Sequence, residues 1–293
     1  MTIKICNNYN QKHISIFKGK LFTENHKKKR PTVIVFDLDE TLGSYTDLNI
    51  IWEYFKYNIS FNTLLDLFPE FSRCGIFSIL DFTYQRKLKG QCDKLFIYTN
   101  NKCSYEFVEL ISKYFSYKLG IKDGELFDQI IRSFKVNGKI IEVLRTTQNK
   151  THDDFIRCTL IPSKTQICFI DNSYFNEMEN KRVYYIQPMS YHHGIFKEEI
   201  IKRLTYFVKT PILDKLYDSL YAFPQDIFEK NKEYFETKKK MHKMVAQKIM
   251  YHIKDFFYLT RPRRKTKKLF YLSSRYTQKV RSSNSARNIS VCH

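Results

Sequence analysis

Two carboxylates follow a short apolar run near the start of the chain. Asp37 and Asp39 come directly after residues 33–36, and Thr41 stands two positions further on. A charged side chain beside a buried strand is costly unless a partner or a chemical task compensates for it. One interpretation is a strand that leads into a helix, with Asp39 or Thr41 as the capping residue. The other is a phosphoryl-transfer site that holds a metal ion, and this stretch alone leaves both open.

Polar residues also end two later apolar runs. Residues 94–99 end in Thr99, and residues 166–171 end in Asp171. Short, continuous apolar runs are typical of strands that are buried on both faces of a parallel sheet. Because the carboxyl ends of parallel strands meet at one edge, residues far apart in the sequence would line one pocket. The predicted pocket comprises Asp37, Asp39, Thr41, Thr99, Asn100, Lys150, Asp171 and Asn172.

Helical patterns alternate with the predicted strands. The strands lie at residues 32–36, 94–99, 166–171 and 182–187, and the helical patterns at 75–89, 103–115, 151–161 and 194–207. This alternation predicts an α/β fold in which helices cover both faces of a parallel sheet. Asn137-Gly138 between two apolar runs adds a β-hairpin at residues 134–141.

The predicted pocket has the groups that phosphoryl transfer requires. Crowded carboxylates raise one another's pKa unless a divalent cation neutralises them, and oxygen ligands suit Mg²⁺. A metal ion, a lysine and a hydroxyl group around a nucleophilic carboxylate stabilise the charge on a transferring phosphoryl group. Lys150 and Thr99 would supply the lysine and the hydroxyl. Lys135 and Lys139 in the predicted hairpin are alternatives for the lysine.

Four motifs, in this order, resemble those of the haloacid dehalogenase superfamily of phosphatases. They are DLDET at 37–41, IYTNN at 97–101, Lys150, and FIDNS at 169–173. More narrowly, the chain is similar to NLI-interacting-factor-like phosphatases, which act on the phosphorylated C-terminal domain of RNA polymerase II. The full DLDETL, the helix start SRCGIFSIL at 72–80 and DNS carry this narrower match, which covers about residues 31–207. The overall look of the chain resembles a version from a large DNA virus of the iridovirus type.

The resemblance implies a Rossmann-like parallel sheet of the haloacid dehalogenase type and a role for each site residue. Asp37 would be the nucleophile that forms an aspartyl-phosphate. Asp39 would protonate the leaving oxygen and then activate water as a base. Thr99 and Lys150 would bind the phosphoryl group, and Thr41 would orient the loop. The implied Mg²⁺ ligands are Asp37, the backbone carbonyl of Asp39, Asp171 and Asn172, the last directly or through water.

Three other residues have alternative interpretations. Arg73 fits either a contact with substrate phosphate or a surface salt bridge. The His192-His193 pair suggests a metal site, although no carboxylate or cysteine stands at metal-binding spacing. We therefore leave these residues out of the predicted site.

The chain departs from the family directly after the first motif. Gly43-Ser44 stands where Val-His is usual, and residues 46–71 have a helical pattern instead of a small β insertion. This insertion is too short for a cap domain, so we expect an open site that admits a protein loop or a nucleic-acid end. The sequence leaves open whether this chain shares the peptide preference of the family.

The charge of the chain is concentrated at its ends. Of the formal net charge of +20, residues 1–30 carry +7 (eight Lys or Arg, one Glu) and residues 261–293 carry +10 (ten Lys or Arg, no acid). We expect a basic, solvated arm at 1–30, a phosphatase domain at 31–210 and a helical extension at 211–260. Ordered structure should begin at Thr32. The tail at 261–293 would be disordered, and its cations and aromatic residues are typical of a flexible nucleic-acid contact. Both basic ends also fit nuclear localisation signals.

The extension and the composition add three expectations. Residues 226–259 predict one long amphipathic helix, which would pack on the domain, bind a partner or lie on a membrane surface, with packing favoured. The start of the chain lacks a secretory signal, and no run approaches the ~18 apolar residues of a membrane-spanning helix. These two observations predict an intracellular protein without a membrane partner. Its compartment would be the cytoplasm or the nucleus, of a host cell if the protein is viral. The seven cysteines lack paired metal-ligand spacing, so reduced thiols are expected.

Three functions follow from the sequence. The first is a Mg²⁺-dependent protein serine/threonine phosphatase that acts through an aspartyl-phosphate on a phosphoprotein such as the RNA polymerase II C-terminal domain. The second is a polynucleotide-end or small-molecule phosphatase on the same fold, with nucleic acid held by the basic ends. The third is a binding protein that recognises phosphate with a degenerate pocket, which the four intact motifs disfavour.

Overall fold

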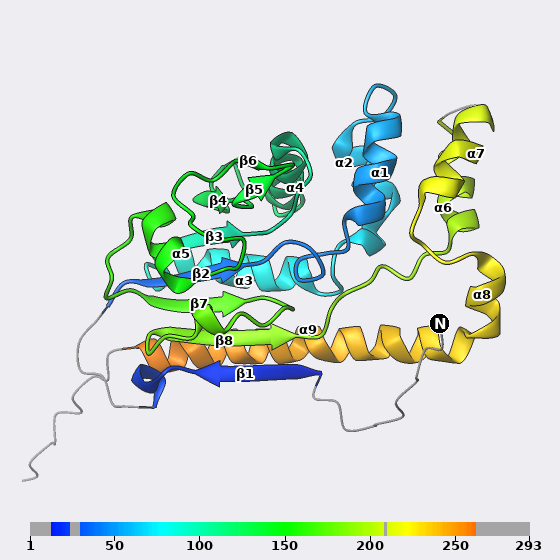
Figure 1. Ribbon diagram of the computed structural model, residues 1–293. Coiled ribbons are helices and arrows are strands. Elements are labelled where there is room, and N and C mark those ends of the chain that lie inside the picture. Colours follow the sequence, from blue (N-terminus) through cyan, green and yellow to red (C-terminus); the bar gives the residue numbers. More distant parts are fainter. Residues whose placement is uncertain (1–12, 24–29, 123, 208–209, 262–293) are drawn as a thin grey trace, which may run out of the picture. The chain divides into compact units, whose positions relative to one another are not determined.

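The computed structural model describes residues 13–23, 30–122, 124–207 and 210–261. These residues form an α/β fold around a six-stranded, mostly parallel sheet (Figure 1). In sheet order the strands are β1 (Ile14–Lys18), β8 (Val183–Pro188), β7 (Gln166–Ile170), β2 (Thr32–Phe36), β3 (Lys94–Tyr98) and β4 (Gln129–Ile131). All neighbouring pairs are parallel except β1 and β8, which are antiparallel.

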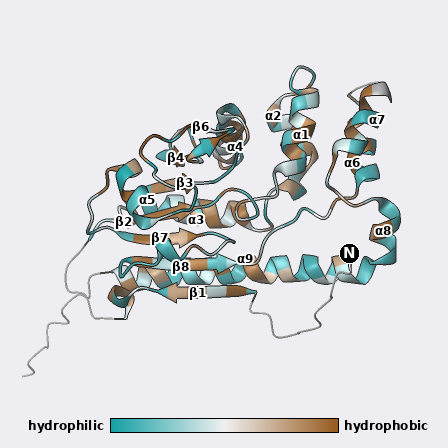
Figure 2. Cartoon of the chain, viewed as in Figure 1, coloured by the Kyte–Doolittle hydropathy of each residue, from teal (hydrophilic) through white to brown (hydrophobic). Residues whose placement is uncertain are grey.

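Helices cover both faces of the sheet, as the alternating pattern predicted. The described helices are α1 (Thr46–Phe55), α2 (Phe61–Leu67), α3 (Ile76–Leu88), α4 (Tyr105–Lys118), α5 (His152–Thr159), α6 (Lys197–Leu204), α7 (Thr210–Ser219), α8 (Gln225–Lys230) and α9 (Lys232–Thr260). Of these, α3, α5 and α9 contact strands of the sheet. Ile34 and Phe36 of β2 lie in the larger core with α3, α4 and α9, whereas Val33 and Val35 face α5. β2 and β7 are buried along their whole length, and most of β7 is coloured as hydrophobic in Figure 2.

β2 is the strand at which the chain changes direction across the sheet. From β2 the chain proceeds to β3 and β4 on one side, and it later returns to β7 and β8 on the other side. Open α/β sheets bind ligands at the carboxyl ends of their strands, next to this kind of switch point. The loop after β2 therefore lies between the end of β3, which Thr99 and Asn100 follow, and the end of β7, which Asp171 and Asn172 follow.

The prediction that order begins at Thr32 is wrong. Residues 14–18 form β1, which pairs with β8 at the edge of the sheet, and the 3-10 turn η1 (Lys20–Phe22) follows it. A side chain at Gly19 would collide with the backbone of Asn180 and Lys181, so this position requires glycine. The strand is short and only partly buried, which is why its apolar pattern was weak within the basic segment. The rest of the predicted arm, 1–12 and 24–29, and the tail at 262–293 lie outside the described residues.

The predicted helix at 226–259 is divided at Asn231 into α8 and α9. The second half of α9 packs against β1, β7 and β8, and it buries Ile249, Ile253 and Phe256 in the larger core. Of the three predicted uses of this helix, packing on the domain was favoured, and this packing is observed. The first turns of α9, from residue 232 to 241, contribute no buried side chain.

Two further predictions are confirmed, and a second strand, β4, was missed in addition to β1. Residues 134–141 contain the hairpin of β5 (Lys135–Val136) and β6 (Lys139–Ile140), and residues 46–71 are helical, with η2 (Pro69–Phe71) after α2. β4 has three residues, too few to give a periodic signal. The cysteines that the structure describes are free thiols.

Among the described helices, none combines the length and the apolar character that crossing a bilayer would require.

Candidate active site

The strand register places two of the predicted carboxylates side by side. Phe36 of β2 pairs with Ile170 of β7, and these are the last residues of the two strands. Asp37 and Asp171, which follow them directly, therefore lie next to each other at the carboxyl ends of the strands. Asp37 is 6% exposed and Asp171 is 1% exposed. Thr99, directly after β3, is also buried at this edge. The structure thus brings together predicted residues from three strands.

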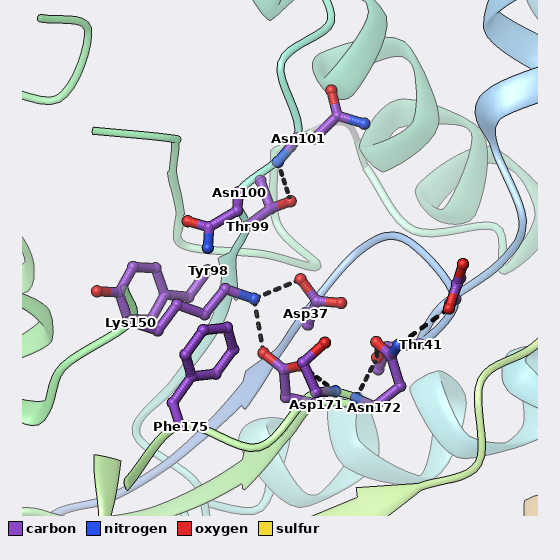
Figure 3. A network of polar contacts seen from close by, with 12 residues as sticks. Asp37, Thr41, Tyr98, Thr99, Asn100, Asn101, Lys150, Asp171, Asn172 and Phe175 are labelled. Carbon is purple, nitrogen blue, oxygen red and sulfur yellow. Dashed lines mark hydrogen bonds and ion pairs between the residues drawn. The ribbon is translucent and has the colours of Figure 1, made fainter. Parts of the chain in front are cut away.

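Lys150 completes this buried centre. Its Nζ donates to Asp37 Oδ1 at 2.5 Å and to Asp171 Oδ2 at 2.6 Å (Figure 3). The rings of Tyr98 and Phe175 lie beside the lysine side chain. Burial alone would lower the pKa of Lys150, but the negative charges of Asp171 and Asp37 raise it above its usual value. The lysine is therefore a fixed cation within the site.

The alternative lysines of the hairpin lie elsewhere. Lys135 and Lys139 are exposed on β5 and β6. Within the described residues, neither forms an ion pair with Asp37 or Asp171. The geometry therefore favours Lys150 as the lysine of the pocket.

A buried arginine that no sequence pattern singled out holds the segment before Lys150. Arg145 is 2% exposed, and its guanidinium donates to the carbonyl oxygens of Gln148 and Asn149 at 2.9 and 3.1 Å. The same group donates to Asn100 Oδ1 at 2.9 Å and to the Thr99 carbonyl oxygen at 3.3 Å. Arg145 thus ties the chain that precedes Lys150 to the end of β3. A sequence gives little signal for such a residue, because most of its partners are backbone carbonyls.

Thr41 and Arg73 hold the loop after β2. Thr41 Oγ1 donates to Asn172 Oδ1 at 2.9 Å and accepts from the Asn172 N–H at 3.0 Å, in accordance with its predicted orienting role. Arg73 donates to the carbonyl oxygens of Thr41 at 2.5 Å, Met189 at 2.9 Å and Glu40. Because Arg73 is buried and bonds to carbonyl oxygens, the interpretation as a surface salt bridge is wrong. Burial lowers its pKa to about 10, so Arg73 stays cationic at neutral pH.

Asp39 is partly exposed and reaches the loop after β3. Its Oδ2 accepts from Asn101 Nδ2 at 2.7 Å. Burial, and then the negative charge of Asp37, raise the pKa of Asp39 to about 6. Such a carboxyl group can hold and release a proton near neutral pH, as a general acid and base must. Asn101 belongs to the IYTNN motif, but its contact with Asp39 was not foreseen.

The Thr99 hydroxyl is buried and keeps a hydrogen for donation. Its Oγ1 accepts from the backbone N–H of Asn101 at 2.9 Å. A hydroxyl that accepts in this way keeps its own hydrogen for donation. Thr99 can therefore donate to an anion that enters the pocket.

The candidate site contains more negative charge than its ion pairs balance. Among the described residues, Lys150 alone forms ion pairs with Asp37 and Asp171, and Asp39 carries a third carboxylate. Burial, and then the charge of Asp37, raise the pKa of Asp171 above its usual value. A divalent cation would supply further positive charge, and carboxylate and carbonyl oxygens suit Mg²⁺.

The candidate Mg²⁺ ligands are not all carboxylates. Within the described ranges, no three His, Cys, Asp or Glu side chains converge as a ready metal cluster, so a carbonyl or amide oxygen would have to contribute. Asn172 is engaged with the loop, because its Nδ2 donates to Glu40 Oε2 and to Ser190 Oγ, each at 3.1 Å. A contact between Asn172 and a metal ion, direct or through water, stays a prediction.

Gly43 lies at a close approach between the loop after β2 and two aromatic residues, Tyr45 and Phe71. A Cβ at this position would overlap the Tyr45 ring and the Phe71 carbonyl oxygen. The adjacent Ser44 N–H donates to the same Phe71 oxygen at 2.8 Å, which holds the two segments together. Gly43 is thus the residue that lets Tyr45 pack against this loop.

The two adjacent histidines have different surroundings. His193 Nε2 lies 3.0 Å from Asp47 Oδ2, and His193 Nδ1 accepts from the Ile195 N–H at 3.1 Å. Both ring nitrogens are therefore occupied by the fold. His192 is exposed, and the described residues around it do not form a metal cluster.

A cavity of about 410 Å³ lies away from these residues. It is lined by Phe17, Lys18, Gly19, Lys20, Glu179, Asn180, Lys181, Val183 and Tyr185. Val183 begins β8, so the cavity lies at the amino end of that strand, whereas the carboxylates follow the carboxyl ends of β2 and β7. We therefore do not assign the cavity to the candidate site.

Comparison of the chain with protein-family models, curated proteins and solved structures gave no match.

Proposed function

We propose that the protein is a Mg²⁺-dependent phosphatase of the haloacid dehalogenase type that acts through an aspartyl-phosphate. The observation that carries this proposal is the buried contact of Lys150 with Asp37 and Asp171 at the switch point of the sheet. Such a contact brings a nucleophilic carboxylate, a fixed cation and candidate metal ligands to the place where α/β sheets bind ligands.

Each residue has a distinct task in the proposed reaction. Asp37 attacks phosphorus with Oδ2, which receives no hydrogen bond from the described residues, while Lys150 holds Oδ1. Thr99 and Lys150 donate to the phosphoryl oxygens, on which negative charge is spread. Asp39 gives a proton to the leaving oxygen and later takes one from the attacking water.

A bound Mg²⁺ would neutralise the surplus charge of the pocket and orient the phosphoryl oxygens. Asp37, the Asp39 carbonyl and Asp171 would hold it, with Asn172 in contact directly or through water. The excess of carboxylates over ion-paired cations supports this assignment.

The proposed substrate is a phosphoprotein. The sequence resemblance points to phosphoserine or phosphothreonine in a peptide such as the RNA polymerase II C-terminal domain. A polynucleotide end or a small molecule is the second candidate, because the net charge of +20 is concentrated at the two ends of the chain. In that case the basic ends of the chain would bind the nucleic acid.

Hydrolysis of p-nitrophenyl phosphate with and without Mg²⁺ tests the activity. We expect Mg²⁺-dependent turnover by the wild type and none by Asp37→Asn, whose shape is almost the same. Absence of turnover by the folded wild type across pH 5 to 8 would overturn the proposal. Full activity of Asp37→Asn would overturn the assignment of the nucleophile.

The substrate class requires a separate comparison. Rates on Ser-Pro phosphopeptides are compared with rates on 3′- and 5′-phosphorylated oligonucleotides, for the full chain and for a chain that ends at residue 260. A preference for peptides that survives truncation supports the protein phosphatase. A preference for oligonucleotides that disappears on truncation supports the second candidate.

A further inference from the structure

Asn101 connects two loops of the candidate site through its side chain. Asn101 Nδ2 donates to Asp39 Oδ2 at 2.7 Å, and the two residues are 62 positions apart in the sequence. The Asn101 backbone N–H donates to Thr99 Oγ1 at 2.9 Å. Asn101 therefore contacts both the predicted acid and the predicted hydroxyl donor.

The orientation of the Asn101 amide is fixed by a second contact. Its Oδ1 accepts from the backbone N–H of Cys103 at 2.7 Å. A backbone N–H can only donate, so an oxygen must face Cys103 and the amide nitrogen must face Asp39. The turn between Asn101 and Cys103 thus determines which group meets the carboxyl group of Asp39.

This contact makes the two oxygens of Asp39 unequal. Oδ2 is occupied by the amide, whereas Oδ1 receives no hydrogen bond from the described part of the chain. A general acid must present one oxygen, with its proton, to the leaving group within hydrogen-bonding distance. An amide that holds Oδ2 restricts rotation of the carboxyl group and leaves Oδ1 for that task.

We propose that Asn101 is a positioning residue that holds Asp39 so that its Oδ1 exchanges protons with the reacting oxygen. The inference rests on the proposed function. In the first step Asp37 forms a bond to phosphorus, the bond from phosphorus to the leaving oxygen breaks, and the proton on Asp39 Oδ1 passes to that oxygen. In the second step Asp39 Oδ1 takes a proton from water, the water oxygen bonds to phosphorus, and the bond to Asp37 breaks.

Leaving-group dependence distinguishes this role from a merely structural one. Poor leaving groups, such as the serine alkoxide, need a proton as the bond breaks, whereas 2,4-dinitrophenolate departs without one. The value of kcat/KM reports the steps up to departure of the leaving group. Loss of the acid's position should therefore lower kcat/KM for alkyl phosphates and spare activated aryl phosphates.

Asn101→Asp is the variant of choice, because its Oδ1 still accepts from Cys103 while a carboxylate oxygen replaces the amide donor. We expect kcat/KM to fall about 10²-fold for phosphoserine peptides or alkyl phosphates, and less than about threefold for 2,4-dinitrophenyl phosphate. Asn101→Ser should show the same selective loss, because its short hydroxyl can accept from Cys103 but cannot reach Asp39. This variant replaces Asn101→Asp in the experiment if circular dichroism shows that Asn101→Asp does not fold.

A uniform loss over all esters, or no loss, would overturn the inference and leave the proposed function standing. Absence of turnover by the wild type on every ester would overturn the proposed function and this inference with it. A loss confined to poor leaving groups supports both.

Discussion

Lys150 Nζ and Asp37 Oδ1 are 2.5 Å apart, although 113 positions separate the two residues in the sequence. The same ammonium group lies 2.6 Å from Asp171 Oδ2, so one cation serves two buried carboxylates. Removing one partner of a buried ion pair leaves an uncompensated charge and is strongly destabilising. Lys150 should therefore stabilise the folded site as well as the phosphoryl group.

Lys150→Met should lower both activity and stability. We expect kcat on p-nitrophenyl phosphate to fall about 10²- to 10³-fold. The free energy of unfolding should fall by about 3 to 5 kcal/mol at pH 7.5. The stability loss should be smaller at pH 5.5, because burial raises the pKa of Asp171 and its protonation would relieve the repulsion from Asp37. Urea denaturation at both pH values measures it.

The matched control is Lys135→Met on the exposed hairpin. It makes the same chemical change outside the pocket, and surface substitutions usually alter stability by no more than about 0.5 kcal/mol. A loss of stability in Lys150→Met that is equal at the two pH values would contradict the electrostatic explanation.

The sequence predicted the pocket because strand ends obey a simple rule. Parallel strands place their carboxyl ends at one edge, so Asp37, Thr99 and Asp171 could be grouped without knowledge of the packing. Lys150 could be added because it precedes a recognisable helix. β1 was missed because an edge strand in a basic segment has a weak apolar pattern.

The supporting contacts could not be predicted in the same way. Arg145 bonds mainly to backbone carbonyls, which exist at every position and leave no pattern in the residue types. Arg73 fills the same kind of role under the loop after β2. Such residues become visible only when the loops that they join are known.

Mg²⁺ should stabilise the protein through Asp171. A ligand that binds only the folded state raises the unfolding temperature. If the Kd for Mg²⁺ is about 100-fold below the Mg²⁺ concentration used, millimolar Mg²⁺ should raise the unfolding temperature by several degrees. Asp171→Asn should lose most of this increase, because the amide is a weaker ligand. Thermal unfolding with and without Mg²⁺ measures the effect.

Asp153→Asn provides the comparison for this metal experiment. The Asp153 side chain is 87% exposed, so the variant should respond to Mg²⁺ as the wild type does. An undiminished response of Asp171→Asn would remove Asp171 from the metal ligands.

His242 should make the fold sensitive to acid. This α9 residue is buried, and neither ring nitrogen has a hydrogen-bond partner among the described residues. Burial, followed by the charges of Arg73 and Lys238, lowers the pKa of His242 to about 3 from 6.5. As the pH falls below about 6.5 the unfolded chain binds a proton that the folded chain does not, so stability is lost. At pH 5 the loss should be about 2 kcal/mol.

His242→Leu should remove this part of the acid dependence. The difference in unfolding free energy between pH 7.5 and pH 5 should be smaller in the variant by about 2 kcal/mol. Met241→Leu, one position earlier on α9, should keep the dependence of the wild type. Identical pH profiles for wild type and His242→Leu would show that the histidine is not buried in its neutral form.

Gly43→Val should destabilise the protein, although valine is usual there in the resembling family. The new side chain would overlap the Tyr45 ring and the Phe71 carbonyl oxygen, so the loop after β2 would have to move. We expect a loss of about 2 kcal/mol or more in urea denaturation. Ser44→Ala keeps the backbone bond to Phe71 and should cost far less. A fully stable Gly43→Val would mean that this loop adapts to the family residue.

Arg145→Lys tests whether the arginine positions Lys150. The variant keeps the positive charge but cannot reproduce a guanidinium that bonds at once to Asn100, Gln148 and Asn149. Since a displacement of about 1 Å in an active site can cost about 10²-fold in rate, kcat should fall by about that factor.

Two comparisons separate positioning by Arg145 from a general loss of stability. Arg157→Lys changes a nearby arginine whose side chain is 46% exposed, and it should keep kcat within about twofold. In Arg145→Ala, low millimolar guanidinium should restore part of kcat, because the ion can occupy the vacated space and bind the same carbonyls. A normal kcat in Arg145→Lys would contradict the positioning of Lys150 by Arg145. The positive charge alone would then suffice, and the five hydrogen bonds of the guanidinium would not be needed to position Lys150.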